Sequence, residues 1–253
     1  MATVPSGTTL RQYSLTGILA LWTAAALPMG LMAWVVAPSI AGPHASDRRF
    51  FITLLAAMTI GLAFQFILVI ALVAVEQRSL NWQAWRDALR LRGPSDATGQ
   101  SSRRAWWWIP ALVVGDGLLQ LLPLTFSAPA RRNLGHFLAS PEGHDTMSGN
   151  WGLFALAVLM LVFNTVLGEE LFFRGLLLPR MQGVFGRKDW IANGILAGLY
   201  HLHQPWSIPR SLVGHTLLYA YPARRFRSTW FGIAAHSAAS AFILVMLLAL
   251  VID

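Results

Sequence analysis

Acidic and histidine side chains occur in the second half of this sequence, inside stretches that are otherwise apolar. The adjacent pair Glu169 and Glu170 is followed by Arg174, and two histidines, His201 and His236, come later in the chain. An ionisable group within an apolar membrane segment is costly and is by default a candidate for function. Carboxylates and neutral imidazoles together can activate a water molecule, with or without a metal ion. The residue types therefore predict hydrolytic chemistry.

The spacing of the first group separates its two carboxylates. Glu170 and Arg174 are four residues apart with the acid first, which is the favoured order for an ion pair on a helix. Glu169 lies about 100° further round the helix and cannot share that geometry. An unpaired carboxylate in a low-dielectric environment is poised to act as a general base. A charged helix end with both acids in contact with water is the alternative interpretation.

The two histidines are predicted to lie on separate helices. His201 stands in the middle of an apolar segment, where it could orient water, bind a metal, or serve only as a hydrogen-bonded core residue. His236 and Ser240 are four residues apart and share a helix face. Ser240 could equally bond back to the carbonyl of residue 236. The pattern assigns no role to His203, His215 or Asp116.

Other hydrolytic patterns are missing from the sequence. It contains no His-Glu-x-x-His zinc motif, no Gly-x-Ser-x-Gly serine elbow and no phosphate-binding glycine loop. The chain has no cysteine, which excludes thiolate metal sites, a cysteine nucleophile and disulfides. Spacing allows a serine–histidine pair of Ser240 with His201 or His236, but that pair would leave both glutamates without a role.

The composition indicates a membrane protein. Of the 253 residues, 55% are hydrophobic and only 12% are charged, and the mean hydropathy is +0.54. A soluble domain carries about 25% charged residues, so a soluble multi-domain enzyme and a disordered chain are both excluded. The net charge of +8 comes from basic residues in short loops between uncharged runs. This arrangement is typical of membrane topology and argues against a nucleic-acid partner.

The uncharged runs predict an all-α, polytopic membrane bundle of about seven transmembrane helices. A membrane-crossing helix needs about 20 predominantly apolar residues. We expect helices near residues 14–37, 51–75, 106–126, 151–179, 190–206, 209–223 and 229–251. With the N-terminus inside, the inner segments hold 14 of the 19 basic residues, as the positive-inside rule requires. The arginine-rich composition favours a bacterial cytoplasmic membrane.

The chain is predicted to divide into two parts. Residues 1–130 form the N-terminal spans, and their loop 76–105 carries an amphipathic helix on the inner leaflet. Trp82 lies on the apolar face of that helix. Residues 146–253 form a catalytic core of four helices in the C-terminal half.

The order of the polar residues resembles the CPBP family of intramembrane proteases, also called CAAX protease/bacteriocin-processing or Abi. The likeness rests on Glu-Glu-x-x-x-Arg at 169–174, on His201 within Leu-Tyr-His-Leu, and on His236 after Ser-Thr-Trp at 228–230. It covers roughly residues 151–245. Two positions depart from the family pattern: Ala197 stands where phenylalanine is usual, and Ser240 stands where asparagine is usual.

This resemblance implies endopeptidase chemistry in a cavity that is open to the inner side, with Glu169 at its floor. Glu169 and His201 would activate water, His236 with Ser240 would stabilise the oxyanion, and the Glu170–Arg174 pair would brace the helix. Zinc on Glu169, His201 and His236 is a further option. The implied partners are a membrane-associated or hydrophobic peptide or protein substrate and the lipid bilayer.

Two other functions remain open. The serine at position 240 also suits a non-catalytic immunity or scaffold protein that binds a peptide in the same cavity. An ion or proton transporter would use Asp116, Glu169 and the histidines as a relay, but it requires carboxylates spread across the membrane depth. The adjacent glutamates, placed toward the inner side, disfavour the transporter.

Overall fold

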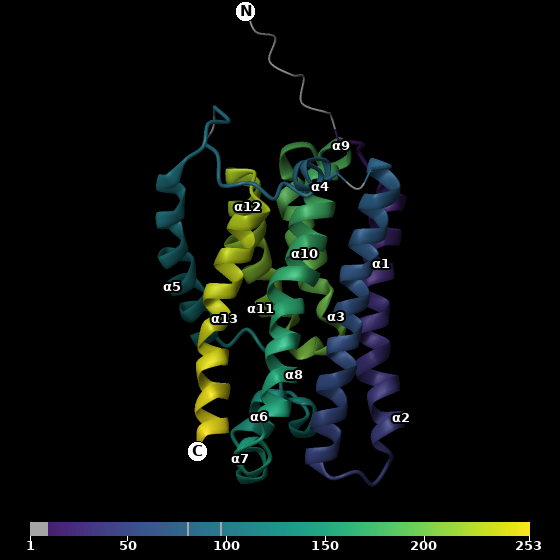
Figure 1. Cartoon of the computed structure of the whole chain (residues 1–253), viewed down its shortest axis with the longest axis vertical. Coiled ribbons are helices and arrows are strands. Elements are labelled where there is room, and N and C mark those ends of the chain that lie inside the picture. Colours follow the sequence, from purple (N-terminus) through teal and green to yellow (C-terminus); the bar gives the residue numbers. More distant parts are fainter. Residues whose placement is uncertain (1–9, 80, 97) are drawn as a thin grey trace, which may run out of the picture.

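The computed structural model describes residues 10–79, 81–96 and 98–253, and this part of the chain forms an elongated bundle of helices (Figure 1). Helices are its only regular elements, apart from one isolated bridge between Ser95 and Ser101. The predicted all-α class is confirmed.

Within the described part of the chain, four helices are long and apolar enough to cross a membrane. The first is α1 (Leu15–Leu31), which continues through η1 (Met32–Val36) into α2 (Ala37–Ala41). The second is α3 (Asp47–Gln77), and the fourth is α13 (Thr229–Ile252). The third runs from Trp151 to Arg180 and consists of α8 (Trp151–Val162), η4 (Phe163–Gly168), η5 (Leu171–Leu177) and η6 (Leu178–Arg180). The chain therefore has the helices of an integral membrane protein.

The other three predicted segments are helical but shorter. They are α5 (Trp108–Leu121), α10 (Asp189–Leu199), and the run of α11 (Ile208–Val213), η10 (Gly214–Ala220) and α12 (Tyr221–Phe226). At 1.5 Å per residue, α5 and α10 extend for only about 21 Å and about 17 Å, less than the ~30 Å of a hydrocarbon core. The count of seven membrane crossings is therefore not confirmed.

Short helices occupy the two ends of the bundle and the turns between the longer helices. They are α4 (Trp82–Ala88), η2 (Arg103–Trp107), η3 (Ala130–Arg132), α6 (Leu134–Leu138), α7 (Pro141–Met147), α9 (Gln182–Phe185), η7 (Gly186–Lys188), η8 (His201–His203) and η9 (Pro205–Ser207).

A polar side chain fixes the start of each long helix. Ser14, Ser46, Asn150 and Ser228 precede α1, α3, α8 and α13, and each accepts a hydrogen bond from a backbone N–H in the first turn. These N-caps satisfy donors that have no partner within the helix. The apolar runs thus begin at defined residues.

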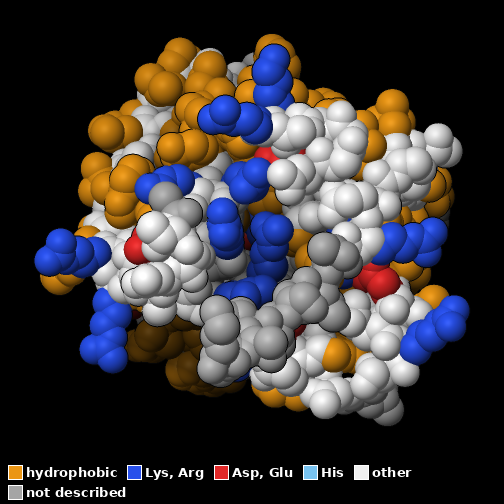
Figure 2. Space-filling model, turned by 90° about the horizontal axis from the view of Figure 1, so that it is seen from above, with side chains coloured by type: hydrophobic (Ala, Val, Ile, Leu, Met, Phe, Trp, Pro, Cys, Tyr) orange, Lys and Arg blue, Asp and Glu red, His pale blue; other side chains and the backbone are white. Residues whose placement is uncertain are grey.

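The helices α4, α9 and α12 lie at one end of the bundle, which we call the basic end (Figure 1). Figure 2 looks down on this end and shows many lysine and arginine side chains. Burial and the neighbouring Arg224 guanidinium lower the pKa of Arg90 to about 10, so Arg90 stays charged at neutral pH. Arg224 is itself paired with Asp189 at 2.7 Å.

The loop 76–105 contains the helix α4, which packs on the bundle at the basic end. Leu89, just after α4, belongs to the main core cluster, and Trp85 packs against it, whereas Trp82 is exposed. The buried Arg180 pairs with Glu76 of α3 and donates to the Ala88 carbonyl at 3.1 Å. Arg180 thereby joins α3, α4 and the end of the third long helix.

The hairpin of α10 against η10 is closely packed at Gly194. A side chain added at Gly194 would overlap the backbone and side chain of Thr216. We expect Gly194→Ala to lower the free energy of unfolding by about 1–3 kcal/mol, the usual cost of overpacking. The measurement is thermal unfolding in detergent. Gly117→Ala on α5 is the control, because nothing lies within 4 Å of its added carbon. An unchanged midpoint for Gly194→Ala would contradict the close packing.

Candidate active site

Glu169 and Glu170 lie where the third long helix is wound most loosely. They stand between the π-helical segments η4 and η5, and both carboxylates are buried. Widened turns of this kind are frequent at functional sites. Gly168, just before the pair, lies close to α3, since an added side-chain carbon would lie 3.4 Å from the Leu62 carbonyl. The sequence thus places two adjacent acids deep in the bundle.

Glu170 is held by two basic groups. Its Oε1 atom lies 3.3 Å from Nη1 of Arg174 and 3.1 Å from Nδ1 of His236. Gly232 makes room for this carboxylate, because a side-chain carbon there would lie 2.5 Å from Glu170 Oε2. The ion pair expected from the four-residue spacing is present, and His236 of α13 is hydrogen-bonded to the same carboxylate.

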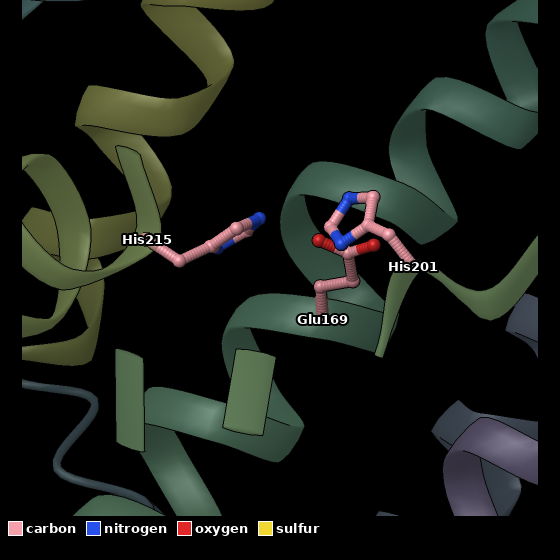
Figure 3. A group of neighbouring side chains, drawn as sticks. All are labelled: Glu169, His201 and His215. Atoms are coloured by element: carbon pink, nitrogen blue, oxygen red, sulfur yellow. The ribbon is translucent and has the colours of Figure 1, made fainter. Parts of the chain in front are cut away.

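Glu169 faces a different set of groups. It forms a cluster with His201 and His215 in which one ligand atom from each side chain lies within 4.8 Å of the others (Figure 3). All three residues are buried, and Glu169 Oε2 has no hydrogen-bond partner among the described residues. The two adjacent glutamates are thus separated into one that is paired and one that is not.

The ring of His201 has a fixed orientation. Its Nδ1 lies 3.1 Å from the carbonyl oxygen of Ala197. A carbonyl oxygen only accepts hydrogen bonds, so Nδ1 carries the proton. In the neutral ring, Nε2 is then left unprotonated and can accept a proton, orient water or bind a metal.

The ring of His215 has the opposite arrangement. Arg174 donates from Nη2 to Nδ1 of His215 at 3.0 Å and to the His215 backbone oxygen at 3.2 Å. A guanidinium only donates, so Nδ1 is the acceptor. The pattern of the sequence had assigned no role to this residue. The only signal for it was a histidine in an uncharged stretch, after Gly214.

The distances in the Glu169 cluster would allow one metal ion, but the hydrogen bonds fit it only in part. A metal-bound histidine almost always donates its other N–H to an acceptor, and His201 does so through Ala197. His215 instead has a guanidinium donor at its Nδ1. His236, expected as the third zinc ligand, is hydrogen-bonded to Glu170 and is not in the cluster. The described residues therefore do not provide three well-oriented ligands for zinc.

A cavity of about 670 Å³ adjoins this cluster. The lining includes the three histidines His201, His215 and His236, together with Ser240. The lining residues of α13 run from His236 to Ile243, away from the basic end where this helix begins. The cavity therefore extends from the cluster toward the end of the bundle opposite the basic end, and the expected opening toward the inner side stays a prediction. The register of α13 against η4, fixed by the Ser237–Thr165 hydrogen bond of 3.2 Å, places Ser240 beside the cavity.

Two further polar residues are placed by their neighbours. Asp116 of α5 lines the cavity and accepts a hydrogen bond from the Tyr219 hydroxyl at 3.1 Å. The Tyr219 ring stacks on His236 with centroids 4.7 Å apart. His203 is turned toward a second, mostly apolar cavity of about 320 Å³. The N-terminal part of the chain thus supplies one carboxylate to the cavity wall.

The comparison with known families agrees with this geometry. Residues 151–242 match the family model described as Type II CAAX prenyl endopeptidase Rce1-like. Comparison with curated proteins and with solved structures finds no match. The matched segment contains both glutamates, Arg174 and the histidines of the cavity, and it confirms the resemblance to the CPBP proteases. Residues 151–242 of this chain are therefore similar to the Rce1-like type II CAAX prenyl endopeptidases.

Proposed function

We propose that the protein is an intramembrane endopeptidase that hydrolyses a peptide bond with water activated by Glu169 and His201. The observation that carries the proposal is the buried Glu169 carboxylate, whose Oε2 has no partner among the described residues and which lies beside a histidine with a free Nε2. Membership of residues 151–242 in a protease family supports the same reaction.

In the proposed reaction, a water molecule binds between Glu169 and Nε2 of His201. Glu169 takes one proton as the water oxygen attacks the scissile carbonyl, which forms a tetrahedral intermediate with a negatively charged oxygen. The intermediate collapses when the C–N bond breaks, and the proton held by Glu169 passes to the leaving amine. This assignment gives each atom of the water a destination in the two products.

His236 and Ser240 both line the cavity, and in the proposed reaction Ser240 is the one of the two that donates to the oxyanion. The Nδ1 proton of His236 is donated to Glu170, so the neutral ring presents an acceptor to the cavity. The Ser240 hydroxyl is free to donate one hydrogen bond. Glu170 and Arg174 hold His236 and the helix in position.

The remaining features of the proposal concern the surroundings of the site. The substrate is a hydrophobic or membrane-associated peptide or protein, because the cavity lies within an apolar bundle. The protein is placed in a bacterial cytoplasmic membrane with its N-terminus and basic end inside. Residues 146–253 act as the catalytic core and residues 1–130 as supporting spans. Zinc is not part of the proposed reaction, because His215 is not oriented as a ligand.

Terminal-peptide profiling of membranes tests this proposal. Cells expressing the wild type are compared with cells expressing Glu169→Gln at equal abundance. New peptide termini that appear only with the wild type would establish proteolysis and identify a substrate. Identical termini in both samples would overturn the proposal and favour the immunity or scaffold function, which the serine at position 240 also suits.

A further inference from the structure

We infer that His215 is a further catalytic residue of the proposed reaction. Its neutral ring donates the Nε2 hydrogen to the carbonyl oxygen of the substrate as that oxygen becomes an oxyanion. The inference rests on the proposed endopeptidase function and assigns a role to a residue that the sequence pattern did not select.

The first argument is the position of the ring proton. Arg174 Nη2 lies 3.0 Å from His215 Nδ1, and a guanidinium has donors only. Nδ1 must therefore contribute its lone pair, and the single proton of the neutral ring is on Nε2. Nε2 of His215 is thus held as a hydrogen-bond donor, whereas Nε2 of His201 is held as an acceptor.

The second argument is that this arrangement cannot easily reverse. Arg174 is buried, is fixed on one side by Glu170 and donates also to the backbone oxygen of His215. Rotation of the His215 ring would bring a carbon or an N–H against the guanidinium. A donor that is already oriented before the reaction stabilises developing charge without the cost of reorganisation.

The third argument is location. His215 lies in the cluster with Glu169 and His201, and it lines the cavity that the substrate would enter. Water activated by Glu169 attacks a carbonyl carbon that must lie next to this carboxylate. The carbonyl oxygen is then within reach of a side chain that borders the same space. His236, the third histidine of the cavity wall, donates its Nδ1 proton to Glu170 and has none to offer the substrate in its neutral form.

A pair of substitutions at residue 215 tests this role by kinetics. His215→Gln places an amide N–H near the position of Nε2, whereas His215→Leu removes the donor and keeps the side chain large. We expect His215→Leu to lower kcat by about 10²–10³-fold with little change in KM, the usual effect of losing one oxyanion donor. His215→Gln should recover a large part of this loss.

Two readouts separate a hydrogen-bond donor from a metal ligand or a structural residue. Elemental analysis should find no difference in bound zinc between the purified wild type and the His215→Gln and His215→Leu variants. A long-range proton–nitrogen correlation spectrum of histidine-labelled wild type should show Nε2 of His215 as the protonated nitrogen, with assignment from the His215→Gln spectrum. Protonation at Nδ1, or stoichiometric zinc lost in both variants, would overturn the inference.

The kinetic outcomes also distinguish this inference from the function on which it rests. An inactive Glu169→Gln together with a fully active His215→Leu would leave the proposed protease intact and refute the role of His215. A wild type without proteolytic activity would refute both. Equal losses in His215→Leu and His215→Gln, with equal unfolding temperatures, would also count against donation from Nε2.

Discussion

The substitution Glu169→Gln is expected to lower the turnover number of the purified protein by about 10²–10⁴-fold, the usual contribution of a general base. Glutamine has nearly the same shape as glutamate but cannot take a proton from water. Because Glu169 Oε2 has no protein partner among the described residues, the change breaks no contact at that atom. KM should therefore change little. The measurement is steady-state cleavage of a peptide from the profiling experiment, with the enzyme in liposomes.

Glu142→Gln provides the matched control for this prediction. Glu142 lies in α7, at the opposite end of the bundle from the basic end (Figure 1). There its Oε1 accepts a hydrogen bond from the backbone N–H of Arg48 at 3.1 Å. The chemical change is the same, but the site is remote from the cavity. Turnover should stay within a factor of about two. Glu169→Gln with the turnover of the wild type would contradict the role of Glu169 as the base.

Arg174→Met should cause the largest loss of stability of any single substitution proposed for this chain. The guanidinium is buried and contacts Glu170, His215 Nδ1 and the His215 backbone oxygen. Its removal leaves the Glu170 carboxylate buried with only His236 as a partner. Breaking a buried ion pair by removing one partner costs about 3–5 kcal/mol. Thermal unfolding in detergent should show a clear decrease of the midpoint relative to the wild type.

A double substitution distinguishes the cost of an unpaired charge from the loss of packing. Arg174→Met combined with Glu170→Gln removes both charges, so the double variant should be more stable than Arg174→Met alone. Arg187→Met, at an exposed position of η7, serves as the control and should unfold like the wild type. A double variant less stable than Arg174→Met would show that the unpaired Glu170 charge is not the main cause of the loss of stability in Arg174→Met.

The features that could be predicted from the sequence are those that depend on neighbouring residues. The apolar runs gave the positions of all seven helical segments, since hydropathy acts over a window of adjacent residues. The Glu170–Arg174 pair was predictable because a four-residue spacing brings two side chains together on any helix. The number of membrane crossings could not be predicted in this way, because α5 and α10 are too short to span the hydrocarbon core even though their sequences are apolar.

The role of His215 depends on contacts between distant parts of the chain. Arg174 and His215 are 41 residues apart, and α10 brings their elements together. It packs against η10 at Gly194 and is bonded to η5 through Asn193 Nδ2, which donates to the Phe173 oxygen at 2.8 Å. His236 and Glu170 are 66 residues apart, and the register of α13 decides which of the two glutamates it contacts. No spacing rule within one helix can give either result.

The sequence by itself determined an all-helical membrane protein, and it carried the resemblance of its C-terminal segment to the CPBP proteases. The tertiary structure alone decided that His236 contacts Glu170 and not Glu169, and that His201 and His215 hold their ring protons on opposite nitrogens. The reason is physical. Hydropathy and helical spacing are local properties, whereas the partner of a buried polar atom is whichever group the packing of separate helices places within hydrogen-bond distance.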